Sequence, residues 1–231
     1  MDALELLLLL AIALAPPVIL SYRLRNAERH RPEPYRVLAQ AFAWGAFVAA
    51  AIAIVAQYAL LAHFGRAYVF DVRLTVMVVL VAPVVEELAK ALGLRLVRER
   101  HPEPEDGYIY GGAVGLGFAA TENVIYVLSA LLLAGEETAM ATALYRGIAT
   151  VALHGAASAV AGHGVWRARY GGSPWWAVWG IGSAIALHVA YNALSALSLP
   201  WATLGAAGMA VVAYMRMMVR VRALDDVNAP R

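Results

Sequence analysis

Cysteine is absent from the 231 residues, which excludes disulfides, thiolate metal sites and a cysteine nucleophile. Charge is also scarce: 15% of the residues are charged, against about a quarter in soluble domains. Hydrophobic residues make up 62% of the chain, a composition suited to a lipid bilayer. The net charge is only +2, and the basic residues lie between apolar runs, so nothing here indicates nucleic-acid binding. We therefore expect an integral membrane protein.

No internal repeat, low-complexity linker or long polar domain interrupts the apolar runs. About seven runs are long enough to cross a bilayer, at about 3–20, 37–63, 74–95, 107–134, 139–166, 175–197 and 199–220. Helices satisfy their own backbone in lipid, whereas open sheets do not. The sequence predicts an all-α polytopic transmembrane helical bundle, with residues 1–231 as a single integral membrane domain. The first run is expected to stay as a helix, because no positive charge precedes it as in a signal peptide.

Basic residues gather in alternate links of this predicted bundle. The links on one side contain Arg23, Arg25, Arg29, Arg31, Arg36, Arg95, Arg98, Arg100, Arg167, Arg169, Arg216, Arg220, Arg222 and Arg231. The opposite links contain only Arg66 and Arg73. Because positively charged links remain in the cytoplasm, the alternation predicts an N-terminus outside the membrane and a C-terminus in the cytoplasm.

The third predicted span contains three ionisable side chains within five residues: Glu86, Glu87 and Lys90, the only lysine of the chain. Each such group costs at least ~2.5–3.5 kcal/mol at bilayer depth, so they are expected to face a protein interior or a wet cavity. The i,i+3 and i,i+4 spacings place both acids near the lysine on one helix. The lysine can neutralise one acid, which leaves the other available for chemistry.

Further polar residues fall near the middle of the next three spans. They are Glu122 and Asn123 in the fourth span, His154 in the fifth, and His188 and Asn192 in the sixth, with Arg146 nearer the outer end of the fifth. Counting residues from the span ends puts Glu86, Glu122, His154 and His188 at similar depth. We expect these groups to meet in one buried site, within a catalytic core at about 74–197.

Two forms of hydrolytic site are compatible with this set. Glu122, His154 and His188 match the His₂Glu ligands of hydrolytic zinc sites, so zinc or another divalent metal is a candidate cofactor. Either Glu86 or Glu87 is then the general base that deprotonates water. Asn192 is a candidate to orient a ligand or stabilise an oxyanion, and Lys90, Asn123 and Arg146 are candidate supporting residues. In a metal-free alternative, a glutamate activates water and the histidines with Asn192 stabilise the oxyanion.

Two other functions use the same residues. The buried acids suit a non-enzymatic proton or cation carrier, although no inverted repeat or pair of broken helices is visible. A b-type haem held by His154 and His188 is a third interpretation, which three acids at the same depth disfavour.

Four separated motifs resemble one family. The sequence reads E-E-x-x-K at 86–90, F-x-x-x-E-N at 118–123, a mid-span His154, and H-x-x-x-N at 188–192. This pattern resembles the PrsW family of intramembrane proteases, which is related to the CAAX-prenyl-protease superfamily. Where the wider superfamily has F-x-x-x-H, this chain has Glu122.

The resemblance implies an intramembrane endopeptidase that hydrolyses a peptide bond in a membrane-anchored protein substrate, such as an anti-sigma factor. It implies that Glu86 and Glu87 are essential and that His188 supports them. It also places the protein in a bacterial or archaeal cell membrane as a multi-pass protein. Some relatives of this fold are scaffolds, so a scaffold is a further alternative, and the superfamily mechanism leaves the need for a metal open.

Overall fold

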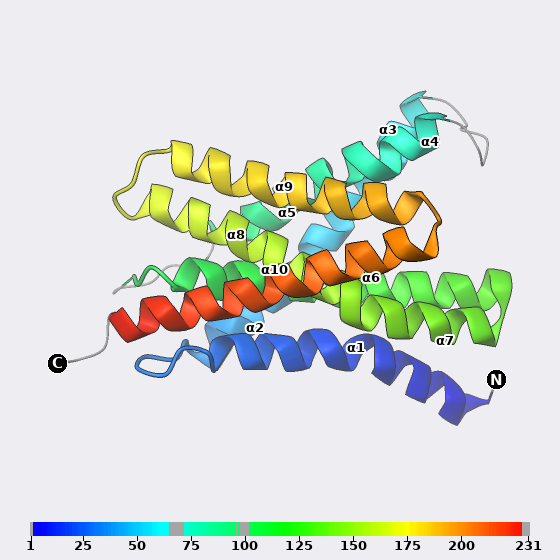
Figure 1. Cartoon of the computed structure of the whole chain (residues 1–231), viewed down its shortest axis with the longest axis horizontal. Coiled ribbons are helices and arrows are strands. Elements are labelled where there is room, and N and C mark those ends of the chain that lie inside the picture. Colours follow the sequence, from blue (N-terminus) through cyan, green and yellow to red (C-terminus); the bar gives the residue numbers. More distant parts are fainter. Residues whose placement is uncertain (1, 65–71, 96, 98–101, 228–231) are drawn as a thin grey trace.

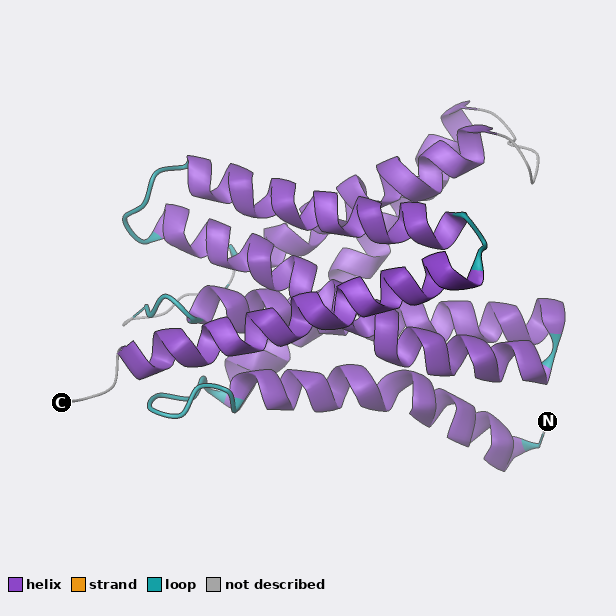
Figure 2. Ribbon diagram, in the orientation of Figure 1, coloured by secondary structure: helices purple, strands orange, loops and turns teal. Residues whose placement is uncertain are grey.

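The computed structural model describes residues 2–64, 72–95, 97 and 102–227, and within these ranges it contains helices and connecting loops but no strands (Figure 2). Most helices run roughly along one axis and form a bundle (Figure 1). The predicted all-α helical bundle is confirmed. Arg66, Arg98, Arg100 and Arg231 lie outside the described residues.

Six helical segments are long and apolar enough to span a membrane: Ala3–Arg25, Tyr35–His63, Asp106–Ala134, Glu136–Arg169, Trp175–Ala196 and Pro200–Val227. They consist of α1 (Ala3–Arg25), α2 (Tyr35–Ala43) with α3 (Ala50–Phe64), α6 (Asp106–Ala134), α7 (Glu136–Tyr145) with α8 (Val151–Arg169), α9 (Trp175–Ala196) and α10 (Pro200–Val227). The remaining predicted span is helical over α4 (Val72–Val76), the π-helical stretch Met77–Val81 and α5 (Ala82–Gly93). It differs from the six in its charged residues, because α5 contains two glutamates and a lysine.

Helix α6 lies at the centre of the bundle, and glycines allow α8 to approach it closely. A Cβ atom at Gly111 would lie 2.3 Å from the backbone oxygen of Ser158, and one at Gly115 would lie 2.1 Å from that of His154. Larger residues at these positions would push the two helices apart. The glycines therefore allow the close packing of α6 and α8 that sets the position of His154.

The links with most of the basic residues lie at one end of the bundle. The C-terminal ends of α1, α8 and α10 all lie on the left in Figure 1, near Arg25, Arg169 and Arg222. The α6–α7 turn, the α9–α10 turn and the N-terminus lie at the opposite end (Figure 1). The fold thus gives the alternation of basic links that the sequence predicts.

Three helices contain π-helical stretches, at Trp44–Ala49, Met77–Val81 and Arg146–Thr150. A π-helical turn changes the backbone hydrogen-bond register and often marks a functional site. In two of these stretches a side chain from another helix bonds a carbonyl oxygen: Thr121 Oγ1 donates to Ala46 at 2.6 Å, and Asn192 Nδ2 donates to Val78 at 3.0 Å. The irregular backbone is therefore held by neighbouring helices.

Candidate active site

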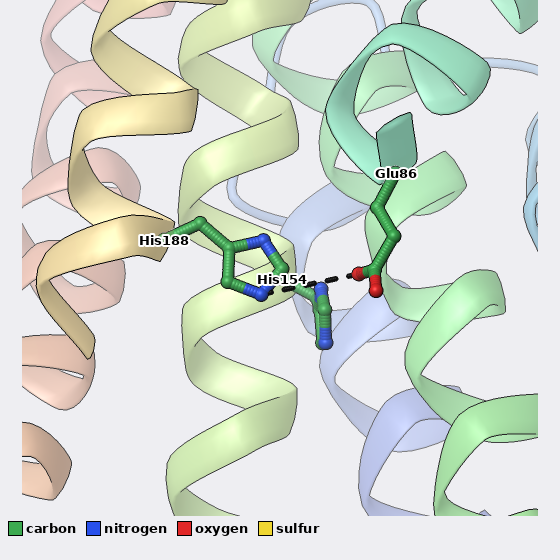
Figure 3. A group of neighbouring side chains, drawn as sticks. All are labelled: Glu86, His154 and His188. Carbon is green, nitrogen blue, oxygen red and sulfur yellow. Dashed lines mark ion pairs between the residues drawn. The ribbon is translucent and has the colours of Figure 1, made fainter. Parts of the chain in front are cut away.

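Three side chains from three helices converge in the bundle interior. Glu86 on α5, His154 on α8 and His188 on α9 each offer one ligand atom, and these atoms lie within 4.8 Å of one another. Figure 3 shows the carboxylate directed toward the two imidazole rings, which are in edge-to-face contact at 4.9 Å between centroids. All three residues are buried. The structure thus brings together residues that are up to 102 positions apart in the sequence.

Glu87 is fully buried behind this group, and both of its carboxylate oxygens have partners. Oε1 lies 2.8 Å from Lys90 Nζ and 2.9 Å from His188 Nδ1. Oε2 accepts a hydrogen bond from Ser158 Oγ at 3.2 Å. Because the carboxylate can only accept, Nδ1 of His188 has the proton, and Nε2 is directed at the site as an acceptor. Glu87 therefore orients His188.

Lys90 connects the glutamate pair to the second histidine. Its ammonium lies 2.7 Å from Nδ1 of His154 and 4.1 Å from the centroid of the Phe118 ring. An ammonium only donates hydrogen bonds, so Nδ1 of His154 accepts and its Nε2 is the protonated nitrogen. That nitrogen donates to Oε2 of Glu122 at 2.8 Å. Lys90 thus fixes the tautomer of His154, as Glu87 does for His188.

Glu122 is also paired with Arg146, whose guanidinium lies 2.7 Å from the same Oε2 atom. Arg146 packs over the ring of Tyr126 at 3.9 Å and donates from Nε to Asn123 Oδ1 at 3.1 Å. Asn123 is buried and bonds to the backbone oxygen of Ala13 at 3.3 Å. The predicted supporting residues Asn123, on α6, and Arg146, in the π-helical stretch before α8, therefore form one chain of contacts that ends at the carboxylate of Glu122.

Glu86 has one carboxylate oxygen without a hydrogen bond. Gln57 Nε2 donates to Oε1 at 3.1 Å, whereas Oε2 is buried and makes no hydrogen bond with any described residue. Lys90 Nζ lies 3.8 Å from Oε2, and His188 Nε2 lies 3.9 Å from it. Of the two adjacent glutamates, Glu86 is the one with an oxygen available for a further partner.

A cavity of about 810 Å³ lies against this group. Glu86, Glu122, Arg146, His154, His188 and Asn192 contribute to its wall. Most of the remaining wall is apolar and comes from α3, α6, α7 and α9. Glu87 and Lys90 lie behind the wall, so they support the site without facing the cavity.

The structure adds contacts that the sequence patterns do not reveal. Gln57 bonds to Glu86, and Ser158 bonds to Glu87. Ser158 could have been found from its i,i+4 spacing to His154, whereas one glutamine in an apolar span gives no signal of its own. Asn192, predicted to orient a ligand or an oxyanion, bonds to the backbone of Val78 and lines the cavity.

The residues present can hold a divalent metal once Nε2 of His154 has released the proton that it donates to Glu122. Nε2 of His188 is already an acceptor and faces the hydrogen-bond-free oxygen of Glu86. Two histidines and one carboxylate are a common ligand set of hydrolytic zinc sites. The group within 4.8 Å contains Glu86 where the sequence predicted Glu122, but Glu122 contacts the same group through His154.

The model of the family described as "PrsW family intramembrane metalloprotease" matches residues 33–221. A curated relative, "Protease PrsW" of Clostridioides difficile (strain 630), is 33% identical over 124 residues, which cover 52% of this chain and 51% of the relative. The chain thus matches about half the length of that relative. No solved structure matches the chain.

Proposed function

Because the chain belongs to the PrsW family of intramembrane metalloproteases, we propose that it hydrolyses a peptide bond in a membrane-anchored protein segment. The observation that carries this proposal is the free Oε2 of Glu86 beside two oriented imidazoles at the wall of a large, mainly apolar cavity. A cavity of about 810 Å³ is large enough for several residues of an extended peptide.

We assign activation of water to Glu86. A general base needs a lone pair that is not already used, and Glu86 keeps one, whereas Glu122 is held by Arg146 and Glu87 by three donors. Glu87 is a positioning residue that holds His188, and Lys90 is a positioning residue that holds His154. Their buried ion pair fixes the histidines before substrate enters, which reduces reorganisation during the reaction.

His154, His188 and a carboxylate would hold the metal that the family name implies. We propose Glu122 as that carboxylate, with the proton that now joins it to His154 Nε2 released when the metal binds, and this leaves Glu86 as the base. A divalent metal there supplies a Lewis acid for water and for the scissile carbonyl. Asn192, on the cavity wall, is the proposed donor to the oxyanion once its bond to Val78 is exchanged.

The basic end of the bundle supports a proposed membrane orientation. We propose that this end faces the cytoplasm, with the N-terminus outside, in the cell membrane of a bacterium or archaeon. The cavity extends from the site past α7 and the C-terminal end of α9, which lie toward the other end. The substrate is therefore expected to enter the cavity from the outer half of the membrane. Residues 1–231 are proposed to act as a single domain, with a fold related to the CAAX-prenyl-protease superfamily.

The test is co-expression with a single-pass anti-sigma factor that has a reporter on its cytoplasmic side. The wild-type protein is expected to release the reporter, and Glu86→Gln and His188→Ala are expected to abolish release while still inserting in the membrane. Glu137→Gln, an exposed acid at the start of α7, is the matched control and should cleave normally. Full cleavage by Glu86→Gln would contradict the assignment. Ion flux in sealed vesicles that depends on Glu86, without cleavage of any reporter, would favour a carrier.

A further inference from the structure

A second group of carboxylates lies at the basic end of the bundle. It comprises Glu28 and Glu33 from the α1–α2 link, Glu103, Glu105 and Asp106 from the segment leading into α6, and Asp225 near the end of α10. Five of the six residues are buried, and Glu103 is partly exposed. We call this set the carboxylate cluster. It shares no residue with the candidate active site.

Glu28 is the member that joins the cluster together. Ligand atoms of Glu28, Glu105 and Asp225 lie within 4.8 Å of one another. The same holds for Glu28, Glu103 and Asp106. The carboxylate of Glu28 therefore faces acids from both of the other chain segments.

Glu28 also lacks a partner of its own. Its side chain is 1% exposed, and neither Oε1 nor Oε2 has a hydrogen-bond partner among the described residues. An unsatisfied buried carboxylate is costly, and native proteins seldom leave one without a donor or a cation.

The neighbouring acids, in contrast, are held in place. Asp225 accepts backbone N–H groups of Arg29 at 2.9 Å and His30 at 3.2 Å. Asp106 accepts the backbone N–H of Glu103 at 2.8 Å. Each of these carboxylates keeps lone pairs beyond the bonds described. The cluster thus has fixed walls around the unpaired carboxylate of Glu28.

Arg31 pairs with Glu103 at 3.3 Å, but its side chain is 63% exposed, so water screens that pair. Burial, followed by the negative charges of Glu33 and Glu105, raises the pKa of Glu28 to about 8. The electrostatic environment of Glu28 therefore favours added positive charge.

We propose that the carboxylate cluster binds a hard divalent cation, Mg²⁺ or Ca²⁺, with Glu28 as the central ligand. The available donors are all oxygens, which these cations prefer. Oxygens on opposite sides of one bound Ca²⁺ are at most about 5 Å apart, which agrees with the 4.8 Å limits. The cation would connect the α1–α2 link, the start of α6 and the end of α10. It would thus stabilise the end of the bundle opposite the cavity.

The experiment follows thermal unfolding of the detergent-purified full chain, stripped with EDTA and then titrated separately with MgCl₂ and CaCl₂. We expect a saturable rise in Tm on the order of 5 °C for the preferred cation. Glu28→Gln should lose this rise, while its Tm in EDTA should equal or exceed that of wild type because a buried repulsion is removed. Glu137→Gln is the control for loss of an exposed acid and should respond as wild type.

Two further variants separate this cluster from the active site and guard against misfolding. His188→Ala should keep the full cation response, because that residue belongs to the other site. If Glu28→Gln cannot be purified, Asp225→Asn provides the second test. It retains an oxygen for the N–H of Arg29 and should weaken the cation response. The proposal is overturned if wild type shows no rise, if Glu28→Gln responds as wild type does, or if only His188→Ala loses the response.

Discussion

Nδ1 of His188 lies 2.9 Å from Oε1 of Glu87, although 101 positions separate the two residues. The contact uses the glutamate that does not face the cavity. It leaves Nε2 of His188 directed at Glu86, the glutamate that does. Two neighbouring acids on one helix therefore have different positions: one orients an imidazole, and the other faces it.

Glu86→Gln should reduce proteolysis by about 10²–10⁴-fold, the range expected for loss of a general base. The amide keeps the shape of the side chain and its contact with Gln57, so folding and insertion should be unchanged. Reporter release in membranes measures the effect. A residual activity close to wild type would show that another group activates the water.

Glu87→Gln should destabilise the fold as well as impair activity. Removal of one charge leaves Lys90 buried without its closest counter-ion, at a cost of roughly 3–5 kcal/mol. The double variant Glu87→Gln/Lys90→Met should recover much of this stability without recovering proteolysis, because His188 and His154 both lose their orienting partners. Thermal unfolding in detergent measures the first effect and reporter release the second. Equal Tm values for the single and double variants would argue against a stabilising ion pair.

The zinc content of variants should distinguish the roles of the two cavity glutamates, Glu86 and Glu122. Glu122→Gln and His188→Ala are expected to lower bound zinc well below that of wild type, whereas Glu86→Gln should retain zinc and lose activity. Elemental analysis of purified protein provides the measurement. Loss of zinc from Glu86→Gln but not from Glu122→Gln would exchange the roles of the two carboxylates.

Gly115→Ala should lower both stability and activity. The new methyl group would lie 2.1 Å from the backbone oxygen of His154, so α6 and α8 must separate and His154 must move. The matched control is Gly182→Ala on α9, where nothing lies within 4 Å of the new atom. The control should unfold at a similar temperature to wild type and cleave normally. Similar behaviour of the two variants would contradict the close-packing argument.

Local features of the sequence already determine much of this protein. Long apolar runs predict membrane helices because lipid requires each backbone hydrogen bond to be satisfied within the segment. Their confirmed positions differ from the predicted bounds by a few residues at most ends. Polar residues at similar depth in four spans predict a shared interior site, because isolated polar groups are costly in lipid. Those inferences need only residue type and spacing along one helix.

The tertiary structure decided which polar groups contact each other. Successive residues on a helix point about 100° apart, so packing against α8 and α9 directs Glu87 inward and leaves Glu86 at the cavity. The contact of Gln57 with Glu86, and the meeting of Glu28 with Asp225, join segments that no sequence periodicity relates. The sequence alone places these residues on helices and links. Their partners depend on how the helices rotate and pack, because each contact forms between side chains that are distant in the chain.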